Sequence, residues 1–358
     1  MNNLKAKNPR IATVYMGKEA FIMGGKFCYF EDYEVGQEGV TNSRTVGEAA
    51  IDTFAYITAD HAVEHLDRHK GAKSPYGERV AHGLLGASLV PGMISMTAPQ
   101  IVGRSVPEAF LSGFECNYRD AIKIGDTIKI KWRVSEKTDD PFQEGFGLVK
   151  TGFQVVNQEE KAVYDGTLTT RLRKELAKGV RLQFKAGEPW QVKEFVLDPE
   201  KFYYMEDFIV NEGGVTGGRT ITETDIVNFS GLTGDYDPLY LDALFAKESV
   251  FGERIAPAMM VYTVGFGLWI LDGDFFKAKV APEAATWAGH LADGASFLAP
   301  VKLGDTLHCI HKVDSVRASK SKPELGILRI AFQMLNQRDE VVQEGYILMT
   351  RGTKASEK

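Results

Sequence analysis

The sequence predicts two α+β domains of the same fold, each a long antiparallel sheet wrapped around one buried helix. Residues 27–81 reappear 175 positions later, and 14 of the 38 positions from Arg44 to Ala81 are identical in the second copy. Unrelated sequences would share about 2 or 3. Each copy also contains one segment that is apolar on nearly every helical face, followed by segments that alternate apolar and charged residues. A period this long indicates a duplicated domain and not a solenoid.

The first helix of each copy is predicted from a capping signal. Thr45 and Glu48, repeated as Thr220 and Glu223, have the spacing of a capping box, in which a hydroxyl and a carboxylate each satisfy a free backbone N–H. We therefore expect each helix to start at its threonine.

The second helix of each copy is predicted to be buried. Residues 81–95 are apolar nearly all round, and so is the segment that begins at Ala256. A helix without a polar face belongs in the core. Pro257 fits the first turn of such a helix.

The later part of each copy is predicted to form half-buried antiparallel strands. Apolar residues alternate with charged or polar ones, as expected for strands with one buried face. The apolar positions are Ile128, Ile130, Trp132 and Val134 in the first copy and Leu328, Ile330, Phe332 and Met334 in the second. Here the repeat offset is 179, because Ile124-Gly125-Asp126-Thr127 matches Leu303-Gly304-Asp305-Thr306.

These patterns divide the chain into four parts. Residues 1–26 are predicted to be an N-terminal extension, 27–173 the first domain, 174–200 a linker and 201–354 the second domain. The linker is charged and contains two prolines, so we expect it to lie on the surface.

The composition excludes several classes of protein. The net charge of −6 argues against a general nucleic-acid binder. No window of about 18 apolar residues predicts a membrane span, and the N-terminus lacks the apolar core of a secretory signal. The three cysteines are widely spaced, which indicates reduced thiols and a cytoplasmic protein.

Several motifs together resemble the MaoC-like dehydratases, the (R)-specific enoyl-CoA hydratase family with the hot-dog fold. They are Phe-Glu-Asp-Tyr at 30–33, Arg-Thr-Val-Gly-Glu at 44–48, Phe-Ala-Tyr-Ile-Thr-Ala-Asp at 54–60 and Gly-Glu-Arg-Val-Ala-His-Gly at 77–83. With the second copy, the resemblance covers about 300 residues. It implies a tandem, double hot-dog fold.

The resemblance also implies the catalytic residues. In the family an Asp and a His five positions later form the catalytic pair, which corresponds here to Asp60 and His65. The family's oxyanion donor, a glycine at the start of the central helix, corresponds to Gly83, and His82 beside it is expected to contact substrate.

Other site positions depart from the family pattern. Ala62 and Val63 stand where the family usually has Asn-Pro, so we expect them at the substrate. In the second copy Tyr240 replaces the histidine, and Pro257-Ala258 replace His-Gly. The second copy is therefore predicted to hold substrate, through Tyr240, without catalysing its conversion.

The chemistry of the residues agrees with hydration of an enoyl thioester. The reaction needs a water activated at C3, a proton at C2 and stabilisation of charge on the thioester oxygen. A carboxylate and an imidazole can hold one water and move its protons. A helix N-terminus supplies free N–H groups and a favourable dipole.

Other interpretations of these residues remain open. Asp60 also suits a loop-capping role. His61, His65 and His69 have a helical spacing that zinc sites use, but the second copy has Tyr236, Tyr240 and Leu244 there, so we expect no metal. Arg79, which the repeat retains as Arg254, is expected to support the fold.

The predicted function is thus a lyase that hydrates or dehydrates an acyl-CoA thioester, with no cofactor. The expected partner is the acyl-CoA substrate, and a homodimer is one option for assembly. The alternatives are a hot-dog thioesterase and a non-catalytic acyl-thioester-binding protein. Large aromatic residues of the second copy are expected to narrow the acyl pocket, namely Tyr236, Tyr240, Phe251, Tyr262, Phe266 and Trp269.

Overall fold

The computed structural model describes most of the chain, in the ranges 29–97, 109–177, 182–184, 187–198, 200–272 and 289–354. Near the N-terminus it also describes the backbone of β1 (Thr13–Met16) and β2 (Glu19–Ile22), which pair with each other. The rest of the predicted extension lies outside the described residues. Among the described residues, no helix has both the length and the apolar character needed to cross a bilayer.

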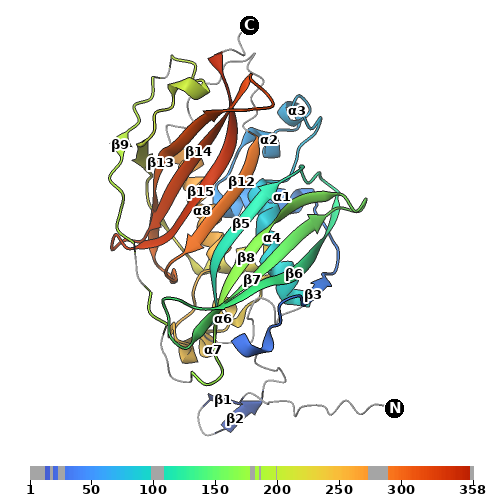
Figure 1. Cartoon of the computed structure of the whole chain (residues 1–358), viewed down its shortest axis with the longest axis vertical. Helices are drawn as coiled ribbons and strands as arrows, with labels where there is room; N and C mark the ends of the chain where they lie inside the picture. The colour runs from blue at the N-terminus through green and yellow to red at the C-terminus, as the bar shows by residue number, and fades with distance from the viewer. Residues whose placement is uncertain are drawn as a thin grey trace.

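One long sheet forms the front of the molecule in Figure 1. Its main strands run in the order β3-β6-β7-β8-β5-β12-β15-β14-β13-β10-β9. The strands of the first half are β3 (Glu38–Val40), β4 (Arg44–Thr45), β5 (Phe110–Tyr118), β6 (Thr127–Asp139), β7 (Phe146–Val156) and β8 (Ala162–Arg173). Those that follow are β9 (Lys193–Glu194), β10 (Glu212–Val215), β11 (Arg219–Thr220), β12 (His290–Phe297), β13 (Thr306–Ala318), β14 (Leu325–Leu335) and β15 (Val341–Gly352).

The two halves meet at the centre of this sheet. Strands β5 and β12 pair antiparallel, with Ala292 opposite Asn117 and Ser296 opposite Gly113. The two copies therefore share one continuous sheet.

The helices pack behind the sheet (Figure 1). They are α1 (Glu48–Thr58), α2 (Val63–Leu66), α3 (Arg68–Gly71), α4 (Gly83–Thr97), α5 (Glu223–Thr233), α6 (Pro238–Leu241), α7 (Ala243–Glu248) and α8 (Ala258–Asp272), with 3-10 turns η1 (Phe30–Asp32) and η3 (Met205–Asp207).

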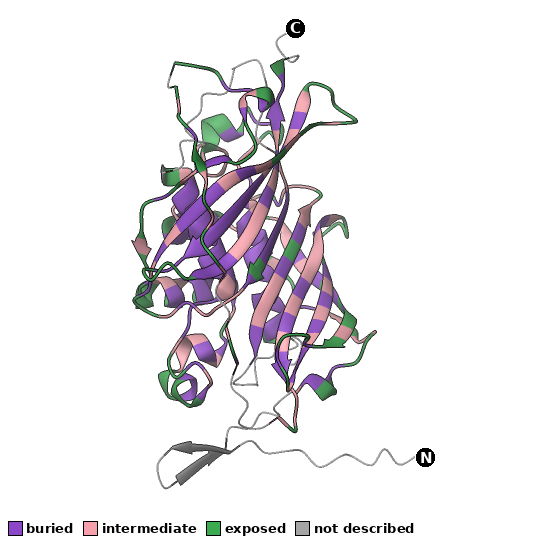
Figure 2. Cartoon of the chain, turned by 60° about the vertical axis from the view of Figure 1, so that its left-hand side comes forward, coloured by how far each residue is buried: buried purple, intermediate pink, exposed green. Residues whose placement is uncertain are grey.

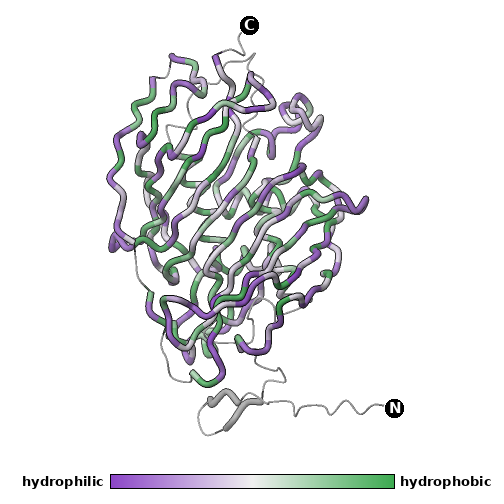
Figure 3. Tube along the Cα trace, in the orientation of Figure 1, coloured by the Kyte–Doolittle hydropathy of each residue, from purple (hydrophilic) through white to green (hydrophobic). Residues whose placement is uncertain are grey.

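The core lies between α4, α8 and the inner face of the sheet. Figure 2 shows strands that alternate between buried and more exposed residues, and Figure 3 shows hydrophobic and hydrophilic residues mixed along the same strands. The predicted inward positions of β6 and β14 are all buried, namely Ile128, Ile130, Trp132, Val134, Leu328, Ile330, Phe332 and Met334. The predicted double hot-dog fold is confirmed.

The start of the first helix differs from the prediction in both copies. Thr45 lies in β4 and Thr220 in β11, so neither caps a helix. The threonine hydroxyls instead bond to Thr127 and Thr306 of the neighbouring strands. Pairing with a neighbouring strand therefore replaces capping at these positions, and each helix begins three residues later, at Glu48 and Glu223. Helix α5 has a capping box two residues further on, between Thr222 and Asp225.

Each central helix crosses the first helix of the other half at a glycine. A methyl group on Gly267 of α8 would lie 1.7 Å from the Thr58 carbonyl oxygen at the end of α1. A methyl group on Gly92 of α4 would lie 2.3 Å from the Thr233 carbonyl oxygen at the end of α5. Only glycine permits such an approach. The loop after α1 is thus held against the second half.

Candidate active site

The turn after α1 buries Asp60. Ala59 ends the helix in the left-handed region, at φ 65°, where the second copy has Gly234 at φ 79°. A non-glycine residue in this conformation costs about 1–3 kcal/mol, and such strained residues are common at functional sites. The Asp60 N–H donates to the Thr58 hydroxyl at 3.2 Å, and the Asp60 residue is only 3% exposed.

The one-turn helix α2 presents His65. Its Nδ1 lies 2.9 Å from the Val80 carbonyl oxygen. A carbonyl only accepts, so Nδ1 carries the proton and Nε2 is left as a base. The Arg79 guanidinium donates to the His65 carbonyl at 2.6 Å and pairs with Asp52 at 2.8 Å. Arg79 therefore ties the His65 turn to α1, which agrees with a structural role.

The absence of Asn-Pro does not change this turn. The residue before α2, Ala62, has φ −58° and ψ 135°, and its counterpart Asp237 before α6 has φ −58° and ψ 131°. The Asp60 carboxylate accepts a hydrogen bond from the Ala62 N–H at 3.2 Å. Asp60 thus caps its own loop as well as facing His65.

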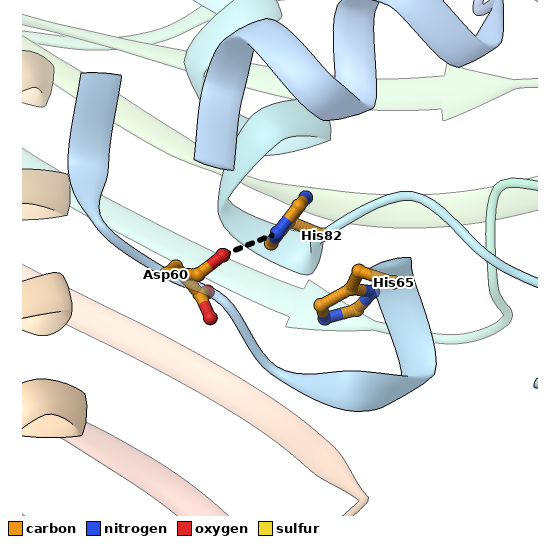
Figure 4. Close-up of side chains that lie close together, drawn as sticks. All are labelled: Asp60, His65 and His82. Carbon is orange, nitrogen blue, oxygen red and sulfur yellow. Dashed lines mark hydrogen bonds between the residues drawn. The ribbon is translucent and has the colours of Figure 1, made fainter. Parts of the chain in front are cut away.

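His82 is a buried neighbour of both groups. Its Nε2 donates to the Asp60 backbone carbonyl at 3.0 Å (Figure 4), and its ring lies 4.0 Å from the His65 ring, centroid to centroid. Burial lowers the pKa of His82 well below its usual value, so the ring is neutral. The next residue, Gly83, opens α4, whose first N–H groups are not used within the helix.

Asp60, His65 and His82 are also the described residues best placed to hold a metal ion. One ligand atom from each lies within 4.8 Å of the others. The exposed residues His61 and His69 do not join this group. The three groups suit either a cation or a hydrogen-bonded water, because two nitrogens and one carboxylate oxygen serve for both.

Burial raises the pKa of Asp60, and the electrostatic influence of the nearby His65 ring opposes this shift only in part. In the unfolded chain this pKa is about 3.9. The stability contributed by the protonated form is therefore fully present below about pH 3.9 and is lost as the pH rises through the raised folded value.

We expect Asp60→Asn, which cannot titrate, to become progressively more stable than the wild type as the pH rises from about 4 to neutrality. Thermal unfolding of both proteins at several pH values measures the difference in Tm. His82 titrates in both proteins, so its effect on stability largely cancels in the difference in Tm. A Tm difference that does not change with pH would contradict the buried, raised carboxyl.

Asp60, His65 and Gly83 line one cavity of about 450 Å³, and Ala62 lies beside them. The second half supplies a large part of the wall, including Phe266, Ile270, His290 and Met349. Val63, predicted to contact substrate, is 42% exposed and is not part of this lining. Of the aromatic residues expected to narrow the pocket, Phe266 is the one that lines it.

The equivalent place in the second copy is almost filled. The cavity beside Asp235 and Tyr240 has a volume of only about 30 Å³. The first half closes it with Pro91, Phe110 and Leu111. Tyr240 therefore lies at this second cavity, about 180 residues along the chain from the Asp60 site, and not in the wall of the 450 Å³ cavity.

Sequence reasoning missed three residues at the larger cavity. His290 and Tyr118 line it, and Asp293 binds both of them from behind. A signal was present in the repeat, because at the offset of 179 the apolar Leu111 and Phe114 correspond to His290 and Asp293.

Two wider depressions, of about 960 and 840 Å³, are lined mainly by strands of the sheet. Neither lining contains a histidine or a cysteine. Among these cavities of the described residues, the one at the start of α4 has histidines in its lining.

One family model matches both copies of the repeat. The family model described as "MaoC like domain" matches residues 32–156 and again 212–329. The two matched segments fall one in each copy of the repeat.

Two curated proteins illustrate the similarity in sequence. Protein MaoC of Klebsiella aerogenes is 34% identical over 125 residues, which is 34% of this chain and 34% of that protein. The 3-hydroxybutyryl-CoA dehydratase of Methylorubrum extorquens is 33% identical over 111 residues, which is 31% of this chain and 66% of that protein. The chain thus spans about a third of the first relative and just under two thirds of the second.

Solved structures share the fold over nearly the whole chain. A MaoC domain dehydratase from Chloroflexus aurantiacus superimposes with a TM-score of 0.71 at 16% identity, covering 91% of this chain and 97% of its own. A Mycobacterium tuberculosis protein with a double hotdog fold gives 0.65 at 15% identity, covering 90% and 98%.

Proposed function

The chain belongs to the MaoC-like domain family, and on this premise we propose that it is a hydro-lyase acting on an acyl-CoA thioester. The reaction is the reversible addition of water to the C2=C3 double bond of a 2-enoyl-CoA. Relatives named 3-hydroxybutyryl-CoA dehydratase and (R)-specific enoyl-CoA hydratase support this choice.

One observation carries the proposal. A buried carboxylate, an imidazole with a free Nε2 and the glycine that opens a helix all line one cavity. These are the groups that hydration of an enoyl thioester requires.

In the proposed reaction the Asp60 carboxylate and His65 Nε2 hold one water. His65 accepts a proton from it as the water oxygen bonds to C3. The π electrons move through C2 towards the thioester oxygen, where the Gly83 N–H at the helix N-terminus stabilises the developing charge. When the enolate collapses, the Asp60–His65 pair transfers to C2 the proton that His65 accepted from the water. The net change is one water added, and dehydration follows the same steps in reverse.

Incubation with a panel of 2-enoyl-CoA and 3-hydroxyacyl-CoA thioesters, with products followed by mass spectrometry, tests the proposal. Interconversion of members that differ by one water is the expected result. Release of free CoA would replace the proposal with a thioesterase. Binding of the panel without turnover would replace it with an acyl-thioester-binding protein.

We expect activity to survive removal of metal ions, because the proposed mechanism needs His65 Nε2 for a water proton. Dialysis against EDTA should leave kcat within about twofold of the untreated protein, and added Zn²⁺ should not raise it. Metal analysis before and after dialysis is the control. Activity lost with EDTA and restored by Zn²⁺ would make Asp60, His65 and His82 metal ligands instead.

A further inference from the structure

We propose that His290, contributed by the second half of the chain, is a further catalytic residue of this site. Its Nδ1 donates a hydrogen bond to the thioester oxygen of the substrate, beside the Gly83 N–H. The inference rests on the proposed function and assigns the degenerate half a direct part in the chemistry.

The position of His290 is the first support. It lines the same cavity as Asp60 and Gly83, and its side chain is 21% exposed. A methyl group on Gly83 would lie 3.5 Å from His290 Nδ1, so this nitrogen faces the start of α4. The ring is held between Phe266, stacked with centroids 5.7 Å apart, and Tyr118 at 4.7 Å.

The second support is the carboxylate behind the ring. Asp293 is fully buried and accepts a hydrogen bond from His290 Nε2 at 2.7 Å. The Tyr118 hydroxyl donates to the other oxygen. Burial, with the charge of Asp293 adding to it, raises the pKa of Tyr118 well above its usual value, so this phenol stays a donor.

This arrangement fixes which nitrogen meets the substrate. Because Nε2 is engaged by Asp293, Nδ1 is the nitrogen left for the cavity. Donation from Nδ1 requires an imidazolium, and the Asp293 carboxylate balances that charge. A cationic donor held in advance at a developing oxyanion stabilises the transition state more than the ground state.

The third support is the difference between the two copies. His290 is opposite Met349 in the sheet and Leu111 is opposite Thr170, so the two positions are equivalent at the offset of 179. Leu111 lines the 30 Å³ cavity, and the counterpart of Asp293 is Phe114. The polar pair therefore occurs at the cavity with the catalytic groups and is replaced by apolar residues at the other.

The electrostatics agree with a shared site. Burial raises the pKa of Asp60, and the opposing influences include both His65 and, more weakly, His290. Imidazole rings from the two halves therefore act on the same carboxyl group.

The test compares His290→Ala with Leu111→Ala, using the 2-enoyl-CoA that the wild type hydrates fastest. His290→Ala should lower kcat about 100-fold, the effect of removing one oxyanion donor, with KM within about threefold. Leu111→Ala, the matched control, should keep kcat within about twofold. Thermal unfolding establishes that both variants are folded.

Asp293 acts through His290 and is a positioning residue. Asp293→Asn should lower kcat about tenfold, and the double variant with His290→Ala should be no slower than His290→Ala alone. Additive losses would mean that Asp293 supports the fold independently of His290.

A spectroscopic readout separates contact with the substrate from a structural role. In Asp60→Asn, which should bind the enoyl-CoA and convert it at least about 100-fold more slowly, the infrared stretch of a carbon-13-labelled thioester carbonyl should shift to lower frequency on binding. Adding His290→Ala should remove a large part of that shift. An unchanged shift, or wild-type kcat in His290→Ala, would overturn the inference. If the wild type hydrates no member of the panel, that result contradicts the proposed function itself, before the role of His290 is tested.

Discussion

Asp60→Asn and His65→Ala should each lower kcat by about 100-fold or more, because proton transfer by a positioned side chain contributes 10² to 10⁴. Asparagine cannot take a proton or carry the negative charge. Its oxygen can still accept the Ala62 N–H that the Asp60 carboxylate binds at 3.2 Å, so the loop should keep its shape. Steady-state kinetics with the established enoyl-CoA, together with circular dichroism, measure both consequences.

The second copy provides matched controls for this pair. Asp235→Asn and Tyr240→Phe change the equivalent positions, beside a cavity of about 30 Å³. Burial raises the pKa of Tyr240 well above its usual value, so this phenol is a poor base. Both variants should keep kcat within about threefold, and an unreactive substrate analogue should titrate one productive site per chain. Wild-type turnover in Asp60→Asn or His65→Ala, or loss of chemistry in Tyr240→Phe, would refute the assignment.

Gly267→Ala is expected to have the second largest effect, although Gly267 belongs to the other half of the chain. Its methyl group would lie 1.7 Å from the Thr58 carbonyl oxygen, so either α8 or the end of α1 must shift. Overpacking of this kind costs about 1–3 kcal/mol of stability. Asp60 follows Thr58 by two residues, so it should move as well. A misplacement of about 1 Å can cost 100-fold in rate.

Gly92→Ala separates the loss of stability from the displacement of Asp60. It makes the corresponding collision, 2.3 Å from the Thr233 carbonyl oxygen, but at the loop that carries Asp235. Both variants should lose similar stability in urea unfolding, whereas Gly267→Ala should lose at least tenfold more kcat/KM than Gly92→Ala. Equal losses of activity would mean that the crossing supports the fold without positioning Asp60.

Much of the fold was predictable from the sequence because its signals are local or periodic. The repeat and the alternating strands predicted two copies of one fold. The helix starts were wrong at Thr45 and Thr220, since both hydroxyls bond to a threonine on a neighbouring strand. A capping signal depends on a few consecutive residues, and pairing with a distant strand overrode it.

Some features of the candidate site were likewise predictable from the sequence, and others were not. Asp60, His65 and Gly83 were selected by spacing and by resemblance, and the turn that carries Asp60 and His65 is built from neighbouring residues. Spacing and resemblance did not predict that Val63 is exposed or that Tyr240 lies away from the larger cavity.

The sequence by itself determined that the chain is a duplication with two unequal copies, because identities at a fixed offset need no knowledge of three-dimensional contacts. Only the tertiary structure decided how the copies complete each other. His290 is 225 positions from His65 and reaches the same cavity because β12 pairs with β5 at the centre of the sheet. The close crossing of α8 over α1 holds the loop of Asp60 in place. Contacts of this kind depend on backbone packing between distant segments, and no local pattern in the sequence encodes them.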